Sequence, residues 1–235
     1  MPLLFDFIYR QFIHYPPAPT ASFKGRTCVV TGSNVGLGLD ACRWMVQLGA
    51  SKVIIACRNV EKGKVAAKDI QETTSCSADN LDVWQLDLSS YASIKAFADK
   101  AKAELPRLDA LCLNAGIGTR TFREVDGVEE SINTNVISPF LLGFLLLPKL
   151  RETASKYKTQ THMTVTASEL YEFAAFKEYH VPEGQIFATL NNKETANMND
   201  RYNVTKLLEV LMVRQMATMY PLDSDHVIIN SVAPG

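Results

Sequence analysis

The chain has 235 residues, of which 47% are hydrophobic, and a formal net charge of −1 at pH 7. This length and apolar content suffice for one well-buried core, so we expect a single soluble domain. The balanced charge argues against a nucleic-acid partner, because attraction to phosphates needs a basic face.

The five cysteines form no CxxC pair and no spacing typical of metal ligands. Several lie in apolar, strand-like runs where a small buried thiol is expected. Free thiols fit a reducing compartment, so we expect a cytoplasmic protein without a metal site. The longest apolar run, Phe140 to Leu147, is too short to span a bilayer.

Residues 1–15 form a dense apolar and aromatic stretch that lacks the basic start and cleavage site of a signal peptide. The stretch either packs on its own domain or touches a membrane surface or the entrance for a hydrophobic substrate. Three prolines, Pro16, Pro17 and Pro19, then form a stiff linker. We therefore divide the chain into an extension with a Pro-rich linker at 1–22 and a folded domain at 23–235.

The folded domain is expected to open with a strand, a glycine-rich turn and a helix. The strand is predicted within Lys24 to Val30, and helical periodicity runs from Leu39 to Leu48. Glycines between them allow close backbone approach, and free N–H groups at a helix start receive a pyrophosphate, although a purely structural turn is the alternative. The turn residues expected to bind a dinucleotide are Gly32, Ser33, Asn34, Val35, Gly36, Leu37 and Gly38.

Two further strands are expected to complete the adenosine end of this site. After the strand Lys52 to Cys57, Arg58 stands where an NAD-binding protein typically has an acidic residue, so we predict NADP(H), with the guanidinium on the 2′-phosphate. The alternative is an exposed arginine without that role. After the strand Leu81 to Leu86, Asp87 and Leu88 are expected to contact the adenine, although Asp87 is equally suited to cap the next helix.

Tyr202 and Lys206 are four residues apart, which places both on one face of the predicted helix. An ammonium beside a phenol makes the phenol acidic enough to exchange a proton with a ketone or an alcohol. Tyr91 and Lys95 have the same spacing, but Tyr91 begins a helix well before the expected active-site strand. We therefore reject Tyr91 as a catalytic residue.

Four motifs together resemble the short-chain dehydrogenase/reductase family. They are the glycine-rich turn, Asn114-Ala115-Gly116 after the strand Leu108 to Leu113, Tyr202-x-x-x-Lys206, and the final run from Asn230 to Gly235. The resemblance covers roughly Lys24 to Gly235. It implies an α/β fold with a doubly wound parallel sheet (Rossmann fold) in three α/β/α layers. The step from Ala56 to Arg58 resembles the retinol-dehydrogenase-like branch, and the Pro-rich lead-in resembles fungal members of unknown or biosynthetic role.

The resemblance also implies site residues. The catalytic residues would be Ser168, which follows the strand His162 to Ala167, together with Tyr202, Lys206 and Asn135. Pro139 has no N–H for the Asn135 carbonyl, which leaves that carbonyl free for a relay water, unless the proline only kinks the helix. Asn133 is a weaker candidate for the relay. The cofactor-binding set adds Asn114, Ala115, Gly116, Tyr202, Lys206, Pro234 and Gly235.

Three features qualify this resemblance. The segment from Glu169 to Arg201 is long for the family and is either a lid or a satellite core cluster. The chain stops at Gly235, so it apparently lacks the family's C-terminal substrate-binding segment and is either a fragment or a degenerate domain. The helix that carries Tyr202 often joins a dimer interface in the family, so we expect a homo-oligomer.

The sequence therefore predicts an NADP(H)-dependent oxidoreductase that reduces a ketone or aldehyde, or oxidises the alcohol, of a small apolar or biosynthetic substrate. Two alternatives remain. One is an isomerase or dehydratase on the same fold with no net redox change, and the other is a non-catalytic nucleotide-binding protein.

Overall fold

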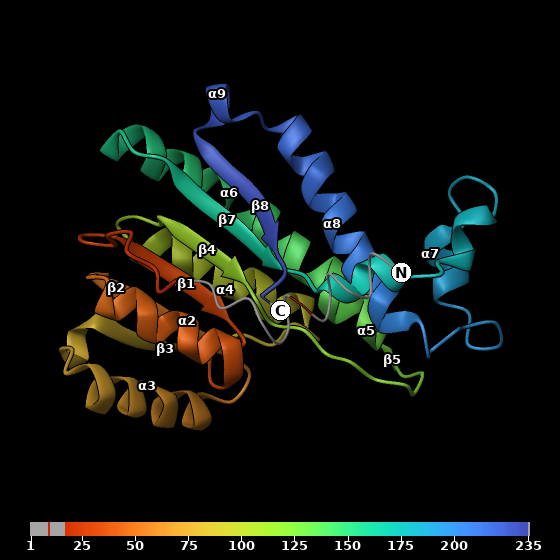
Figure 1. The fold of residues 1–235 in the computed structure, drawn as a ribbon, viewed down its shortest axis with the longest axis horizontal. Coiled ribbons are helices and arrows are strands. Elements are labelled where there is room, and N and C mark those ends of the chain that lie inside the picture. Colours follow the sequence, from red (N-terminus) through yellow and green to blue (C-terminus); the bar gives the residue numbers. More distant parts are fainter. Residues whose placement is uncertain (1–8, 10–16, 235) are drawn as a thin grey trace.

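A parallel six-stranded sheet forms the centre of the protein (Figure 1). The computed structural model describes Tyr9 and residues 17–234. The strand order across the sheet is β3-β2-β1-β4-β7-β8, which reverses direction between β1 and β4. The strands are β1 (Thr27–Thr31), β2 (Lys52–Cys57), β3 (Leu81–Gln85), β4 (Ala110–Leu113), β7 (Thr161–Thr166) and β8 (Val227–Val232). The predicted doubly wound parallel sheet is confirmed.

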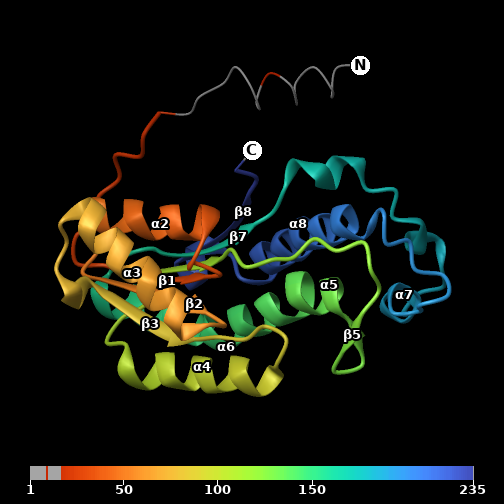
Figure 2. The same cartoon turned by 90° about the horizontal axis from the view of Figure 1, so that it is seen from below.

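The central strands are apolar on both faces because helices cover both faces of the sheet. On one face, Cys28, Val30 and Ile55 pack against α2 (Gly36–Gln47) and α3 (Val60–Thr74). On the other, Val29 and Ile54 belong to the larger core under α4 (Tyr91–Glu104), α6 (Ser138–Tyr157) and α8 (Arg201–Met219). Figure 2 shows α2 and α4 on opposite sides of the sheet. The predicted three-layer arrangement is therefore present.

Parallel strands place all their carboxyl ends at one edge, and the segments that follow those ends meet there. Helix α2 begins at Gly36, three residues earlier than the sequence pattern predicts, so Gly36 to Gly38 form its first turn.

Smaller elements complete the chain: η1 (Ala78–Asn80), β5 (Glu124–Val125), β6 (Val128–Glu129), α5 (Glu130–Ile132), η2 (Asn133–Ile137), η3 (Glu169–Phe173), η4 (Lys177–His180), α7 (Ile186–Leu190) and α9 (Leu222–Asp225).

A continuous helical stretch, Glu130–Tyr157, is long and apolar enough to span a membrane by length and composition. However, 67% of its most apolar window is buried inside the domain, where it packs beside the sheet as a core helix. Within it, η2 is one turn of π-helix. Pro139 has no N–H to close an α-helical bond to Asn135, and the backbone widens at this point.

The long segment between β7 and α8 folds into three short helices, η3, η4 and α7. Its Phe176 and Leu190 side chains are buried in the larger core. The Asp200 carboxylate accepts hydrogen bonds from the Ala175 and Phe176 amides at 3.0 and 3.1 Å, which ties the segment to the start of α8. The segment therefore contributes to the core, while its first residues border the site described below.

Two predictions fall largely or wholly outside the described residues. Membrane contact was expected for residues 1–15, of which the structure describes only Tyr9. Cofactor binding was expected for Gly235, which lies outside the described residues. Phe23 packs against the α2–α3 core and its amide donates to the Leu48 carbonyl at 2.8 Å. The division of the chain at residue 22 stays a prediction.

Candidate functional site

Two neighbouring cavities lie at the carboxyl edge of the sheet. The first, of about 440 Å³, is bordered by Ser168, Tyr202 and Lys206. The second, of about 470 Å³, lies over the glycine-rich turn and the ends of β2 and β3. Both cavities share the lining residues Leu37, Asn114, Gly116 and Ile117. One extended ligand can therefore pass from the second cavity into the first.

The glycine-rich turn has the geometry of a phosphate cradle. Gly32 and Gly36 have positive φ angles of 66° and 56°, and a Cβ on Gly36 would meet nothing within 4 Å. The N-cap residue Val35 makes no side-chain bond to the first turn of α2, which also carries no acidic residue. Unfilled space beside free N–H groups at a helix start fits a pyrophosphate.

Gly38 is required for a different reason, since it lets α2 approach the end of β4. A Cβ there would lie 2.6 Å from Asn114 Nδ2 and 2.9 Å from the Gly32 carbonyl oxygen. The Thr31 hydroxyl accepts hydrogen bonds from the amides of Asn114 and Ala115 at 2.9 and 3.0 Å, which fixes the other side of this contact. The floor of the second cavity is therefore close-packed.

Replacing Gly38 by alanine is expected to lower the free energy of unfolding by about 1–3 kcal/mol, because the added methyl group collides with backbone that cannot move away freely. NADPH affinity should fall as well, since α2 must shift from the turn. Urea unfolding and fluorescence titration with NADPH measure both effects. Gly143→Ala is the matched control within a helix, because its Cβ would meet only side-chain atoms, the flexible Met163 sulfur at 3.1 Å and Leu113 Cδ1 at 3.5 Å. If Gly38→Ala is as stable as Gly143→Ala, the close packing is not essential.

The residues predicted to bind adenosine lie around the second cavity. Arg58 is exposed, lines the cavity and makes no ion pair with any described residue. Asp87 and Leu88 line it too. The Asp87 carboxylate accepts from both the amide and the hydroxyl of Ser89, whereas Ser90 provides the N-cap of α4. Asp87 thus orders the turn before the helix without capping it, and its adenine contact stays a prediction.

Most of the glycine-rich turn also borders the cavity, through Gly32, Asn34, Val35 and Leu37. Ser33 is fully buried, and its hydroxyl donates to the Val30 carbonyl at 2.7 Å. Its side chain therefore shapes the turn from inside. Ala115 and Gly116 line the second cavity, and Pro234 lines the first cavity.

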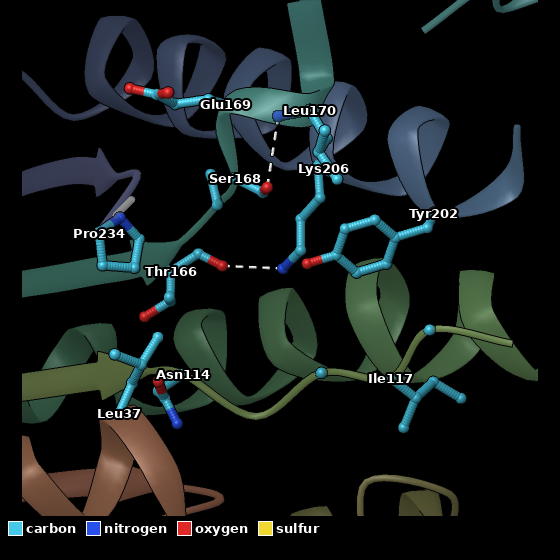
Figure 3. Close-up of a pocket in the computed structure, with 13 residues that line it drawn as sticks. Leu37, Asn114, Ile117, Thr166, Ser168, Glu169, Leu170, Tyr202, Lys206 and Pro234 are labelled. Carbon is cyan, nitrogen blue, oxygen red and sulfur yellow. Dashed lines mark hydrogen bonds between the residues drawn. The ribbon is translucent and has the colours of Figure 1, made fainter. Parts of the chain in front are cut away.

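Tyr202 and Lys206 project from one face of α8 into the first cavity (Figure 3). The Tyr202 hydroxyl points toward the Lys206 ammonium, and Nζ lies 5.6 Å from the ring centroid. Lys206 is 4% exposed, and its Nζ donates to the Thr166 carbonyl at 2.8 Å. The arrangement matches the i,i+4 geometry predicted from the sequence.

Ser168 lies at the end of β7 on the wall of the same cavity. Its hydroxyl oxygen accepts a hydrogen bond from the Leu170 amide at 3.3 Å. A hydroxyl that accepts one bond still has its own O–H to donate. The serine can therefore donate to an oxygen of a bound molecule.

Asn135 lies behind the cavity and joins two of its walls. Its side chain exchanges two 2.8 Å hydrogen bonds with the backbone of Ile117 and donates to the Thr205 hydroxyl at 3.0 Å. This holds the segment after β4 against α8. The predicted role of the Asn135 carbonyl in a water relay stays a prediction.

The second Tyr-x-x-x-Lys pair has entirely different surroundings. The Tyr91 hydroxyl donates to Asn133 Oδ1 at 2.8 Å, and Ser138 donates to the same oxygen at 3.3 Å. Burial raises the pKa of the Tyr91 phenol, with a smaller contribution from the carboxylate of Asp126. Proton transfer near neutral pH requires a lowered phenol pKa, so this raised pKa argues against a catalytic Tyr91. The side-chain oxygen of Asn133, the weaker candidate for the relay, accepts both of these hydrogen bonds.

Several residues of the site were not identified from the sequence. Ile117 and Leu170 line the first cavity, while Glu130 and Thr134 line the second. Leu170 directly follows the Ser168 segment, and Ile117 is the apolar residue after Gly116, so position along the chain could have suggested both. Glu130 and Thr134 come from a distant helix and carry no local signal.

The strand order, the cradle over α2 and the paired cavities define a Rossmann-type dinucleotide-binding domain. The family model described as short chain dehydrogenase matches residues 26–159. The short chain dehydrogenase/reductase dmxR8 of Cryptosporiopsis sp. is 45% identical over 231 residues, covering 97% of this chain and 71% of that protein. The chain therefore belongs to the short-chain dehydrogenase/reductase family, as the motifs predict.

Two further comparisons agree. The short-chain dehydrogenase anuD of Penicillium roqueforti is 37% identical over 237 residues, covering 98% of this chain and 60% of that protein. The structure of Pseudomonas aeruginosa RhlG in an NADP active-site complex aligns with a TM-score of 0.68 at 25% identity, covering 92% of this chain and 75% of that one. The expected similarity to fungal members is confirmed, whereas the similarity to the retinol-dehydrogenase-like branch stays a prediction.

Proposed function

We propose that this protein is an NADP(H)-dependent oxidoreductase that reduces a ketone or aldehyde, or oxidises the corresponding alcohol. The observation that carries the proposal is the shared wall between the two cavities. A nucleotide held over α2 reaches past Asn114 and Gly116 into the cavity bordered by Ser168, Tyr202 and Lys206. Bound NADPH supplies a hydride at its nicotinamide ring.

The side chains of this chain supply position and a proton. Ser168 donates its O–H to the substrate oxygen and holds the carbonyl beside Tyr202. Tyr202 donates its hydroxyl proton to that oxygen as negative charge develops there. Lys206 lies behind the phenol, where its positive charge favours the phenolate that remains and where it also donates to the nicotinamide ribose. Asn135 keeps the segment after β4 against α8, so the two cavities stay joined.

Arg58 supports the choice of NADP(H) over NAD(H). Arg58 borders the nucleotide cavity, and its guanidinium has no carboxylate partner among the described residues, so it is free to bind a 2′-phosphate. The complex of RhlG with NADP is consistent with this choice.

The walls of the first cavity favour a small, largely apolar substrate. Leu37, Ile117 and Leu170 surround the three polar catalytic candidates. An apolar wall with few polar groups binds an apolar molecule and orients one oxygen. The similarity to fungal members of the family supports a biosynthetic substrate. We also propose that the protein is a homo-oligomer and that it is located in the cytoplasm.

The experiment is to incubate the purified protein with NADPH or NADH and a panel of apolar ketones and aldehydes. Loss of NADPH absorbance should accompany one equivalent of alcohol per cofactor, with little activity in NADH. Product formed without cofactor consumption would instead indicate an isomerase or dehydratase. Tight NADPH binding without turnover of any panel member would favour a non-catalytic protein.

A further inference from the structure

Helix α8 carries one acidic residue, Glu209, and that residue is buried beside Lys206. Its carboxylate oxygens lie 2.9 and 3.1 Å from Lys206 Nζ, and the residue is only 2% exposed. Ionised carboxylates are almost never buried without a partner. The lysine that faces Tyr202 is therefore paired with a buried carboxylate.

The hydrogen bonds of Lys206 show how this pairing fixes the ammonium. An ammonium has three N–H donors. The Thr166 carbonyl accepts one at 2.8 Å, and the Glu209 carboxylate oxygens accept at 2.9 and 3.1 Å. Figure 3 shows Nζ between the Thr166 carbonyl and the Tyr202 hydroxyl. The two carboxylate oxygens can share one N–H, which leaves the third donor for the phenol and the cavity.

We propose, on the basis of the function proposed above, that Glu209 is a positioning residue that holds the Lys206 ammonium in place beside Tyr202. A buried ion pair does not by itself stabilise a fold more than apolar residues of similar size would. The pairing is therefore better explained by what it does to Lys206 than by stability alone.

The carboxylate can change its charge near neutral pH. Burial raises the pKa of Glu209 from 4.5 to about 7, against the opposing effects of the Lys206 charge and hydrogen bond. Lys206 is the charged side chain that faces it, Thr166 of β7 presents only its neutral carbonyl, and Tyr202 lies beyond the ammonium. Glu209 is thus largely neutral below this pH and ionised above it, so the ion pair strengthens as the pH rises.

The test compares wild type with Glu209→Gln, which keeps the shape of the neutral carboxyl group but never ionises. At about pH 8.5 the wild-type kcat should exceed that of the variant by about tenfold, because a misplaced catalytic group costs rate steeply. At about pH 5.5 the wild type is itself protonated, so the ratio should fall to within about twofold. A purely structural role would change only the folded fraction, so the ratio of kcat per folded molecule, with the folded fraction measured by circular dichroism, would be about one at both pH values.

The NADPH dissociation constant provides a second readout that needs no substrate, since Lys206 is also proposed to contact the nicotinamide ribose. The variant should bind NADPH more weakly than the wild type at about pH 8.5 and about equally well at about pH 5.5. If the protein reduces no carbonyl but the affinity ratio of wild type to variant changes with pH, the oxidoreductase proposal fails and the role of Glu209 in holding Lys206 stands. If neither the kcat ratio nor the affinity ratio of wild type to variant changes with pH, the proposed role of Glu209 is wrong.

Two further variants keep the test decisive. Glu152→Gln removes the acid of the Lys149–Glu152 pair, which has the same i,i+3 spacing on α6 and lies outside both cavities. It should match the wild type at both pH values. Glu209→Asp retains the charge one methylene farther from Lys206 and should give an intermediate kcat with the pH dependence retained. If Glu209→Gln does not fold, an aspartate variant equal to wild type at both pH values would overturn the proposal.

Discussion

Tyr202→Phe is expected to lower kcat for carbonyl reduction by about 10²- to 10⁴-fold, because the substrate oxygen loses its proton donor. The phenyl ring still fills the same space beside Gly118, whose Cβ would lie 3.4 Å from the Tyr202 ring. NADPH affinity should therefore change by less than about threefold, since Lys206 and the α2 cradle are untouched. Steady-state kinetics at saturating NADPH and a fluorescence titration give the two values.

The chain provides an unusually close control in Tyr91→Phe. Tyr91 has a lysine four residues on, as Tyr202 does, but its hydroxyl donates to Asn133 and does not border the first cavity. Removing that hydroxyl should cost about 1 kcal/mol of stability and leave kcat of the folded protein near the wild-type value. If Tyr202→Phe loses NADPH affinity but keeps its rate at saturation, Tyr202 is not the proton donor.

Arg58→Ala is expected to weaken NADPH binding by about 10- to 100-fold, the loss typical of one hydrogen bond to a charged group. NADH affinity should hardly change, because NADH has no 2′-phosphate for the guanidinium to bind. The preference for NADPH over NADH should therefore shrink by the same factor. Isothermal titration with each nucleotide measures this.

Lys64→Ala is a suitable comparison for Arg58→Ala. Lys64 is an exposed cation of α3 paired with Glu61, and it does not line the nucleotide cavity. Removing it changes the net charge by the same amount as removing Arg58 but should leave both affinities unchanged. Equal weakening in the two variants would mean that overall charge, not a contact from Arg58, selects the nucleotide.

The order and type of the main elements could be predicted from the sequence because local patterns encode them directly. The apolar run Lys52 to Cys57 matches β2, and Tyr91, which was expected to begin a helix, is the first residue of α4. The glycine-rich turn and the Tyr202–Lys206 spacing are also local, since each places its groups within one turn or one helix. Local sequence patterns therefore indicate most of the candidate site.

Other features depend on contacts between distant segments. Both Tyr-x-x-x-Lys pairs have the same local chemistry, and only packing sends Tyr91 to Asn133 and Tyr202 to the cavity. The π-turn at η2 follows from Pro139, yet only the fold shows that it lets Asn135 reach both Ile117 and Thr205. Likewise, the segment after Ser168 was expected to be either a lid or a core cluster. In the structure Leu170 borders the cavity, whereas Phe176 and Leu190 enter the core.

By itself, the sequence determined the class of this protein, because strand patterns, glycines and short-range spacings are properties of neighbouring residues. Only the tertiary structure decided which polar groups are buried together. Glu209 is three residues from Lys206, and this spacing alone does not distinguish it from the largely exposed Glu152 beside Lys149. Burial depends on which elements cover a residue, and that coverage is set by segments far away in the chain.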